Sequence, residues 1–374
     1  MKRMLLLFSL LLLPAVPCAA DREVYTVTNE GGAPLFSIAG EVTIGDEYIS
    51  GDNVLYRVQN VSGTQATAKR IGEEAMPDMS WLDAGEAQPV FAGHDEAIMT
   101  ASKSTDGKKK LIAMYVTHSD ESYVPTDGTQ SIEGQGGIYD VARAFRDALQ
   151  QKGVDVILDE STHLPHDSGA YRRSRRTAER LLKKQPDAII DIHRDGIPDP
   201  DEYKTTIGGK NASQVRLLVG RGNQNSAVNR EFAKEIKAVA DKKYPGLIKD
   251  IFIGKGNYNQ DLSPNAILLE FGTHTLSKER VLESTGVMAD VVSTTLYGPQ
   301  TSGVKAQETV PAKAKSKSAF SSMGVLALVV IVGVIIFALV QTGSVKGAGK
   351  KLGRNLSEMT GGMLGKKKDN TKNK

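Results

Sequence analysis

Between residues 110 and 297 the sequence alternates short apolar runs with amphipathic stretches, and this alternation restricts the chain to a small group of folds. The first run, residues 109–118, is almost continuously apolar before it ends in polar residues, which is typical of a buried parallel strand. The next stretch has apolar residues at helical spacing and ends at Gly153. The strand pattern then recurs at residues 154–160, 187–195 and 265–272. This order predicts an α/β fold with a mostly parallel sheet and helices on both faces.

The regions on either side of this α/β domain have a different composition. Residues 21–105 alternate apolar and polar residues between Gly, Asn and Asp, which predicts a small β-rich region. A turn-like stretch at Ser104–Lys110 separates it from the α/β domain, which we place at residues 106–300. Residues 301–318 are rich in Pro, Ala, Lys and Ser and lack apolar periodicity, so they predict a linker.

The N-terminus has the parts of a secretory signal peptide. Two basic residues precede the apolar run Met4–Leu13, and small residues then lead to a cleavage position after Ala20. We therefore expect residues 1–20 to be removed on export. Cleavage would also remove Cys18, the one cysteine in the sequence, so neither a disulfide nor a cysteine-based zinc site is expected.

A second apolar run, near the C-terminus, predicts a membrane anchor. Met323–Val340 contains 18 residues without a charge, close to the roughly 20 residues that span a bilayer. Residues 343–374 form a tail with eight Lys and one Arg against two acidic residues, which indicates a cytoplasmic location. The sequence therefore predicts a single-pass cell-membrane protein with a transmembrane helix at 319–342 and an extracytoplasmic catalytic domain. The remaining chain is mildly acidic, which argues against binding to nucleic acid.

Residues with catalytic chemistry end or follow three of the predicted strands, where open α/β sheets bind their ligands. Two histidines, one carboxylate and an open position make a catalytic zinc site, and a further carboxylate can act on the water. The alternatives are ordinary hydrogen-bonded histidines and, for the acid inside the apolar run 265–272, an arginine partner, because a buried carboxylate needs one. The candidates are His118 and Glu121 after the first strand, Asp191, His193, Arg194 and Asp195 in the third, and Glu270 in the last.

Four motifs, in a fixed order, resemble a known family. They are YVTHSDESY, GAYRRSR, DIHRD and GKGNYNQDLSPNAILLEFG. On these motifs, the region from residue 110 to about residue 299, roughly half of the chain, resembles stage II sporulation protein P, a family of cell-wall amidases of spore-forming bacteria. That family is in turn distantly similar to zinc-dependent N-acetylmuramoyl-L-alanine amidases, which have an α/β fold.

The resemblance implies roles for individual residues. His118 and His193 match the two histidine ligands of Zn²⁺, and Glu270 matches the catalytic glutamate. Glu121, within the first motif, matches the carboxylate ligand, and Glu133, just before the first helix, is the alternative.

The remaining polar residues receive supporting roles or none. Asp191, Arg194 and Asp195 are expected to orient His193 or to hold the site. Members of the family often carry a further histidine where this chain has Val116, so that histidine is not expected to be an essential ligand. The other histidines match no ligand position and are interpreted as surface or substrate-groove residues: His163, His166 and His274.

The resemblance implies a membrane-anchored peptidoglycan hydrolase that acts in sporulation and engulfment. It would cleave the amide between N-acetylmuramic acid and L-alanine, and by family resemblance stem-peptide crosslinks as well, with zinc-activated water and Glu270 as general base. Peptidoglycan is the expected partner, together with other cell-wall remodelling proteins. Two alternatives remain: a non-catalytic module that binds peptidoglycan and recruits other hydrolases, and a different wall metallopeptidase on the same fold.

Overall fold

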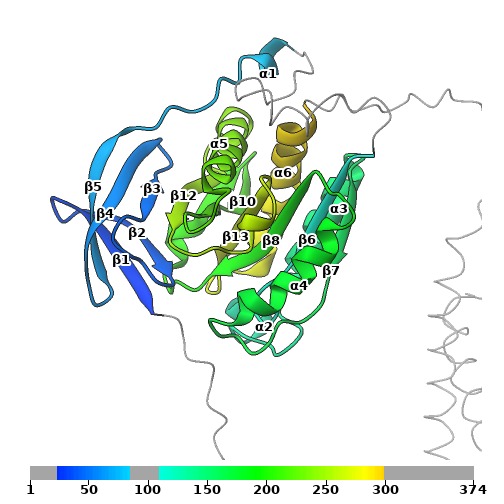
Figure 1. Cartoon of the computed structure of the whole chain (residues 1–374), viewed down its shortest axis with the longest axis horizontal. Coiled ribbons are helices and arrows are strands. Elements are labelled where there is room, and N and C mark those ends of the chain that lie inside the picture. The colour runs from blue at the N-terminus through cyan, green and yellow to red at the C-terminus, as the bar shows by residue number, and fades with distance from the viewer. Residues whose placement is uncertain (1–22, 85–108, 299–374) are drawn as a thin grey trace, which may run out of the picture. The chain divides into compact units, whose positions relative to one another are not determined.

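The computed structural model describes residues 23–84 and 109–298, which form a large sheet with helices on both faces (Figure 1). The sheet has eleven strands in the order β2-β1-β5-β4-β3-β12-β11-β13-β8-β6-β7. Its strands are β1 (Val24–Asn29), β2 (Pro34–Ala39), β3 (Glu47–Ile49), β4 (Val54–Ser62), β5 (Gln65–Glu73), β6 (Leu111–Tyr115), β7 (Asp155–Asp159), β8 (Ala188–Asp195), β11 (Val215–Gly220), β12 (Ile248–Gly254) and β13 (Ala266–Thr273). A separate antiparallel pair consists of β9 (Lys204–Ile207) and β10 (Lys210–Ser213).

The helices connect these strands. The longer ones are α3 (Ile138–Gln151), α4 (Ala170–Leu182), α5 (Ser226–Lys243) and α6 (Lys278–Tyr297). The short ones are α1 (Trp81–Ala84) and α2 (Val124–Asp127), with 3₁₀ turns η1 (Pro200–Tyr203) and η2 (Gln260–Leu262). Helix α3 begins and ends close to its predicted bounds because its apolar residues recur at helical spacing and Gly153 takes a positive φ of 76° after it.

The prediction of a mostly parallel sheet is wrong, because the sheet is mixed. Among the described residues, five strand pairs of the eleven-stranded sheet are antiparallel and five are parallel. Two physical causes explain the difference. Short turns join most of β1–β5, and short turns produce antiparallel neighbours. In addition, β8 reaches β11 through η1 and the β9–β10 hairpin without a crossover helix, and β11 lies antiparallel to β13.

The sequence analysis also missed β11 and β12, which are joined by the crossover helix α5 and lie parallel to each other. Both are short apolar runs that charged side chains interrupt, Arg216 in β11 and Lys249 and Asp250 in β12. These two strands connect the β-rich strands to the rest of the sheet, because β12 pairs with β3 on one side and β11 pairs with β13 on the other. Figure 1 shows β1–β5 at one end of the sheet and β6 and β7 at the other. The domain boundaries named above remain predictions.

The two faces of the sheet have different coverings because successive side chains of a strand point to opposite faces. One face carries Ile190, Ile192 and Leu269, which pack in the main core with residues of α3, α5 and α6. The other face carries Leu218, Phe252 and Leu268, which pack against residues of β1–β5, while α4 covers its β6–β8 end. Glu270 lies two residues after Leu268 in β13 and therefore shares this second face.

The predicted single-pass membrane location is not borne out by the described residues. Within residues 23–84 and 109–298, no helix combines the length and the apolar character needed to cross a bilayer. The predicted transmembrane segment at 319–342, the signal peptide at 1–20, the linker and the basic tail lie outside the described residues. The single-pass location therefore has no support in the structure.

Candidate functional site

The predicted site residues from three separate parts of the sequence lie on the second face of the sheet. His118 follows β6, His193 lies near the end of β8, and Glu270 lies in β13. Strands β8 and β13 are parallel neighbours, and their register sets Glu270 directly beside His193. Because neighbouring strands are about 4.8 Å apart, the two backbones bring these side chains into the same small region.

Two histidines and two carboxylates form a buried group that we call the His193 cluster: His118, Glu121, Asp191 and His193. The rings of His118 and His193 are 5.0 Å apart between centroids and nearly perpendicular. Glu121 Oε1 lies 3.6 Å from His193 Nδ1, and Glu121 Oε2 accepts a hydrogen bond from the backbone N–H of Arg194.

Asp191 faces the other side of the His193 ring. Its Oδ1 lies 3.1 Å from His193 Nε2, and Thr117 donates from both its N–H and its hydroxyl to the Asp191 carboxylate. Burial lowers the pKa of His193, but Asp191 and then Glu121 outweigh burial and raise the pKa of His193 to about 10. Burial raises the pKa of Glu121, but the charge and hydrogen bond of His193, together with the charges of Arg194 and His166, outweigh burial and lower this pKa. The cluster thus favours a positive charge between the two carboxylates.

Glu270 has a different set of partners. It is 7% exposed, and its Oε2 accepts a hydrogen bond of 3.3 Å from the Tyr203 hydroxyl and lies 3.7 Å from Nη1 of Arg216. Burial, followed by repulsion from Asp195, raises the pKa of Glu270 to about 8, against the opposite effect of Arg216. A carboxylate with a pKa near neutrality can both accept and return a proton at physiological pH.

Arg216 is the centre of a second buried group that we call the Arg216 cluster: Asp195, Tyr203, Arg216 and Asp250. Its guanidinium donates to both oxygens of Asp250 at 2.7 and 3.0 Å and to Oδ2 of Asp195 at 2.8 Å. The sequence analysis missed Arg216. The signal that could have found it is a single arginine inside the apolar run VRLLVG, since a fully buried guanidinium requires carboxylate partners.

The three supporting residues named from the sequence have separate positions. Asp191 contacts His193 directly. The Arg194 guanidinium donates to the backbone carbonyls of Ser122 and Gln130 and thereby fixes the loop that carries Glu121. Asp195 belongs to the Arg216 cluster. Of the two alternative carboxylates, Glu121 is buried beside His193, whereas Glu133 is exposed in the loop before α3.

Further aromatic rings surround His118. His166, which matched no ligand position, stacks on His118 with 3.9 Å between centroids, and its Nδ1 lies 2.9 Å from Asp120 Oδ1. Tyr171, at the start of α4, contacts His118 edge-on. His163 is buried and bonded to the carbonyl of Val116, so it is not a surface residue. No spacing in the sequence indicated these contacts.

The donor atoms of His118, Glu121 and His193 are of the types that Zn²⁺ prefers. His193 Nε2 is buried and makes no hydrogen bond, although Asp191 is close to it. Within the part of the chain that the structure describes, no group of three or more His, Cys, Asp or Glu side chains is arranged to hold one ion as it lies. The residues therefore fit zinc by their donor chemistry, and binding requires a rearrangement of their side chains.

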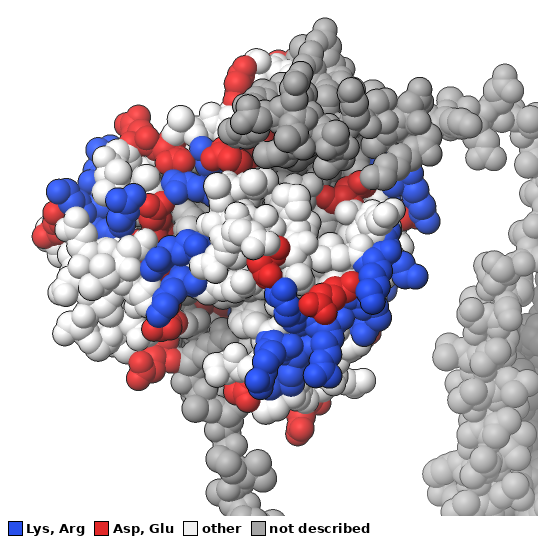
Figure 2. All heavy atoms as spheres, in the orientation of Figure 1, with Lys and Arg blue, Asp and Glu red and all other residues white. Residues whose placement is uncertain are grey.

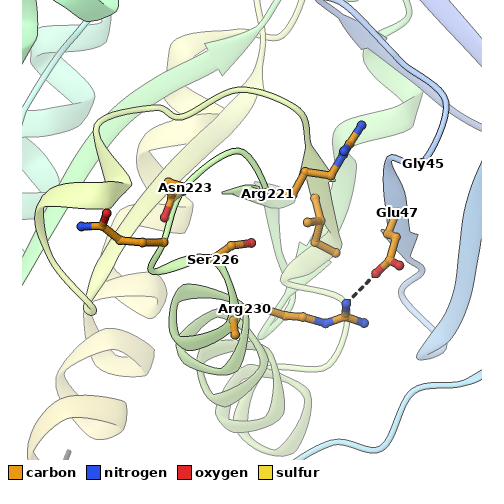
Figure 3. Close-up of a pocket in the computed structure, with 9 residues that line it drawn as sticks. Gly45, Glu47, Arg221, Asn223, Ser226 and Arg230 are labelled. Atoms are coloured by element: carbon orange, nitrogen blue, oxygen red, sulfur yellow. Dashed lines mark hydrogen bonds and ion pairs between the residues drawn. The ribbon is translucent and has the colours of Figure 1, made fainter.

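Two surface features lie outside these clusters. Figure 2 shows basic side chains gathered over α4, which carries Arg172, Arg176 and Arg180 on its exposed side. A cavity of about 470 Å³ lies at the other end of β11 from Arg216, beside the start of α5 (Figure 3). Its two arginines have carboxylate partners within the protein, Arg221 with Asp46 and Arg230 with Glu47, so neither provides an uncompensated charge for an anion.

The sequence matches the model of a known protein family. Residues 51–293 match the sequence model described as Stage II sporulation protein P, which covers more than half of the chain. A curated relative, Stage II sporulation protein P of Bacillus subtilis (strain 168), is 31% identical over 245 residues. This match spans 60% of the chain and 60% of the relative's own length.

The solved structures with weak similarity to the chain include two amidases. The N-acetylmuramoyl-L-alanine amidase from Clostridium difficile 630 has a TM-score of 0.34 and 13% identity, over 50% of this chain and 94% of that one. The CwlD amidase from Clostridioides difficile, solved in complex with the GerS lipoprotein, has a TM-score of 0.33 and 15% identity, over 51% of this chain and 96% of that one. Scores this low support no conclusion about this chain.

Proposed function

This chain belongs to the stage II sporulation protein P family, and on that premise we propose that it is a peptidoglycan hydrolase of sporulation. Its proposed reaction is hydrolysis of the amide between N-acetylmuramic acid and L-alanine, with stem-peptide crosslinks as a second class of substrate. The observation that carries this proposal is the register that sets Glu270 beside His193, while His118 and Glu121, two further side chains of a type that binds zinc, lie next to His193.

His118, Glu121 and His193 are the proposed ligands of a zinc ion. Zn²⁺ bound there would supply a Lewis acid and would lower the pKa of water toward about 7. Glu121 is preferred to Glu133 because it is buried 3.6 Å from His193. Asp191 orients the His193 ring through its contact with Nε2, and the Thr117 hydrogen bonds hold Asp191 in turn.

Glu270 is the proposed general base. It accepts a proton from the water that attacks the carbonyl carbon and then donates that proton to the leaving amine of L-alanine. The raised pKa of Glu270, caused first by burial, supports both steps because the carboxylate and the carboxylic acid then lie close in free energy near neutral pH.

The test is digestion of purified peptidoglycan by the full chain, followed by mass spectrometry of the soluble fragments. An amidase leaves intact glycan strands and free L-alanine amines, whereas a carboxypeptidase or endopeptidase leaves cut stem peptides. We expect Glu270→Gln to lower kcat about 10²- to 10⁴-fold, the usual contribution of a general base. Glu283→Gln is the matched control, because Glu283 is an exposed partner of Lys210.

A zinc chelator should also abolish release of fragments. If Glu270→Gln and His193→Ala both retain wild-type activity, Glu270 is not the base. If the wild-type chain binds peptidoglycan and releases no fragments under any metal condition, the chain is a non-catalytic module that recruits other cell-wall remodelling proteins.

A further inference from the structure

Strand β2, in the N-terminal β-rich part of the chain, lies at the end of the strand order of the sheet. The backbone groups on its outer edge form hydrogen bonds with Asp195 and Arg216 of the Arg216 cluster and with Glu202. Among the described strands, β2 pairs with β1 on one side only. On its other side the N–H of Ser37 donates to Glu202 and the N–H of Ala39 donates to Asp195 Oδ1, each at 3.0 Å. The carbonyl of Ser37 accepts from Arg216 Nη2 at 3.1 Å. Backbone groups that an edge strand would expose are therefore satisfied by the Arg216 cluster and its neighbour Glu202.

Packing supports the same placement of β2. The Phe36 ring lies against the Arg216 guanidinium, with 5.3 Å from the guanidinium carbon to the ring centroid. Gly196, directly after Asp195, allows the close approach of the strand, because a Cβ at that position would lie 2.7 Å from the Cβ of Ala39. Strand β2 is thus fixed to the cluster by hydrogen bonds, by an aromatic contact and by the absence of a side chain at Gly196.

The Arg216 cluster continues from β2 to Glu270. Asp195 accepts from Ala39 through Oδ1 and from Tyr203 and Arg216 through Oδ2. The same Tyr203 hydroxyl contacts Glu270 Oε2 at 3.3 Å. A continuous set of contacts therefore leads from the backbone of β2, through Asp195 and Tyr203, to the carboxylate of Glu270.

We propose that β2, acting through Asp195, Arg216 and Tyr203, holds Glu270 at the position that proton transfer requires. Residues Pro34–Ala39 of the N-terminal β-rich region are then positioning residues of the site. A general base must lie within about 3 Å of the proton it takes, and a displacement of about 1 Å can lower the rate 10²-fold. This inference rests on the proposed role of Glu270 as base.

The most direct test is Tyr203→Phe, which removes one hydroxyl from a buried ring. We expect kcat to fall about 10- to 100-fold while KM and zinc content stay near the wild-type values, because the variant displaces Glu270 and leaves the proposed zinc ligands in place. The loss of the buried hydrogen bond to Asp195 should lower the melting temperature by several degrees, which leaves the chain folded. Tyr244→Phe is the matched control, because the Tyr244 hydroxyl also contacts a carboxylate, that of Asp290, and Tyr244 packs against the main core on the opposite face of the sheet from Glu270. Its kcat should equal that of the wild type.

Two variants of β2 extend the test to the N-terminal region. Ala39→Pro removes the N–H that binds Asp195, and Phe36→Leu removes the ring beside Arg216 if the proline variant does not fold. Phe252→Leu is the control for the second variant, since Phe252 packs in the same core. We expect Phe36→Leu and Ala39→Pro to lower kcat at unchanged KM, and Phe252→Leu to lower stability alone.

A double variant tests whether β2 affects Glu270 through Asp195 and Tyr203. If Ala39 and Tyr203 both act through Asp195, Ala39→Pro with Tyr203→Phe should lose no more activity than the more damaged single variant. Multiplied losses would overturn the shared route, and wild-type kcat in Tyr203→Phe, Ala39→Pro and Phe36→Leu would overturn the whole inference. Loss of activity in Glu270→Gln alone would then leave the proposed function intact, whereas full activity in Glu270→Gln would refute the role of Glu270 itself.

Discussion

The Arg216 cluster and the His193 cluster lie on the same face of one sheet, and both bury carboxylates, yet they balance the negative charge differently. In the first, a guanidinium that is always charged contacts Asp195 and Asp250 at hydrogen-bond distance. In the second, the ionisable group in contact with both Asp191 and Glu121 is the imidazole of His193, which can carry a proton or lose it. The first cluster contains a permanent cation, and the second contains groups that can exchange one.

This difference indicates that the Arg216 cluster has a structural role and that the His193 cluster can take part in chemistry. A buried pair with a permanent charge keeps one geometry, because removal of either partner leaves an uncompensated charge. A cluster of histidines and carboxylates can accept a divalent ion in place of a proton. Glu270 lies between the two clusters. It is in register with His193, whose protonation can change, and its carboxylate is 3.7 Å from Arg216, whose charge is permanent.

The largest effect should come from removing the permanent cation. Arg216→Met keeps an apolar stem of similar length and leaves Asp195 and Asp250 buried without their partner. We expect the free energy of unfolding to fall by about 3–5 kcal/mol, measured by urea denaturation followed by circular dichroism. Arg57→Met, which breaks a pair between Glu47 and a half-exposed arginine, should cost less than about 1 kcal/mol. Similar losses in both variants would contradict the comparison.

A smaller change in the free energy of unfolding should come from adding zinc, which would bind at the His193 cluster. Zinc at a free concentration 100 times its dissociation constant should raise the free energy of unfolding by about 2.7 kcal/mol, as any ligand of the folded state does. His193→Ala should lose this gain, and Mg²⁺ should not replace zinc because imidazole is a poor ligand for it. Calorimetry with each ion gives the measurement. Equal zinc stabilisation of His193→Ala and wild type would place the ion elsewhere.

The smallest change in stability concerns Glu235, a buried carboxyl that pairs with neither an arginine nor a histidine among the described residues. Glu235 on α5 is buried, and burial followed by repulsion from Glu231 raises its pKa to about 8. Because this pKa is higher in the folded than in the unfolded chain, its contribution to stability is complete below about pH 4.5 and is lost as the pH rises through about 8. Glu235→Gln should therefore be more stable than wild type by about 1 kcal/mol at alkaline pH, from unfolding curves across pH. Glu73→Gln, an exposed control, should show no such gain.

Local sequence patterns predicted much of the secondary structure. The apolar runs around β6, β8 and β13 are continuous, and the spacing from Ile138 to Leu149 is helical, so these elements could be recognised without knowledge of their neighbours. The positions of His118, His193 and Glu270 at or near strand ends followed from the same runs. Strands β11 and β12 were missed because charged residues interrupt both of them. The buried charges of Arg216 and Asp250 are tolerated because their partners, distant in the sequence, lie beside them in the fold.

The sequence by itself determined which residues are apolar, which strands and helices those residues favour, and which donors were available for chemistry. The tertiary structure alone decided that β11 runs antiparallel to β13 and that Glu121 Oε1 lies 3.6 Å from His193 Nδ1. It also decided that Ala39 of β2 donates a hydrogen bond to Asp195, 156 residues later in the chain. The physical reason is that a two-residue period fixes the face on which a side chain lies, whereas strand order and register depend on contacts between residues far apart in the chain.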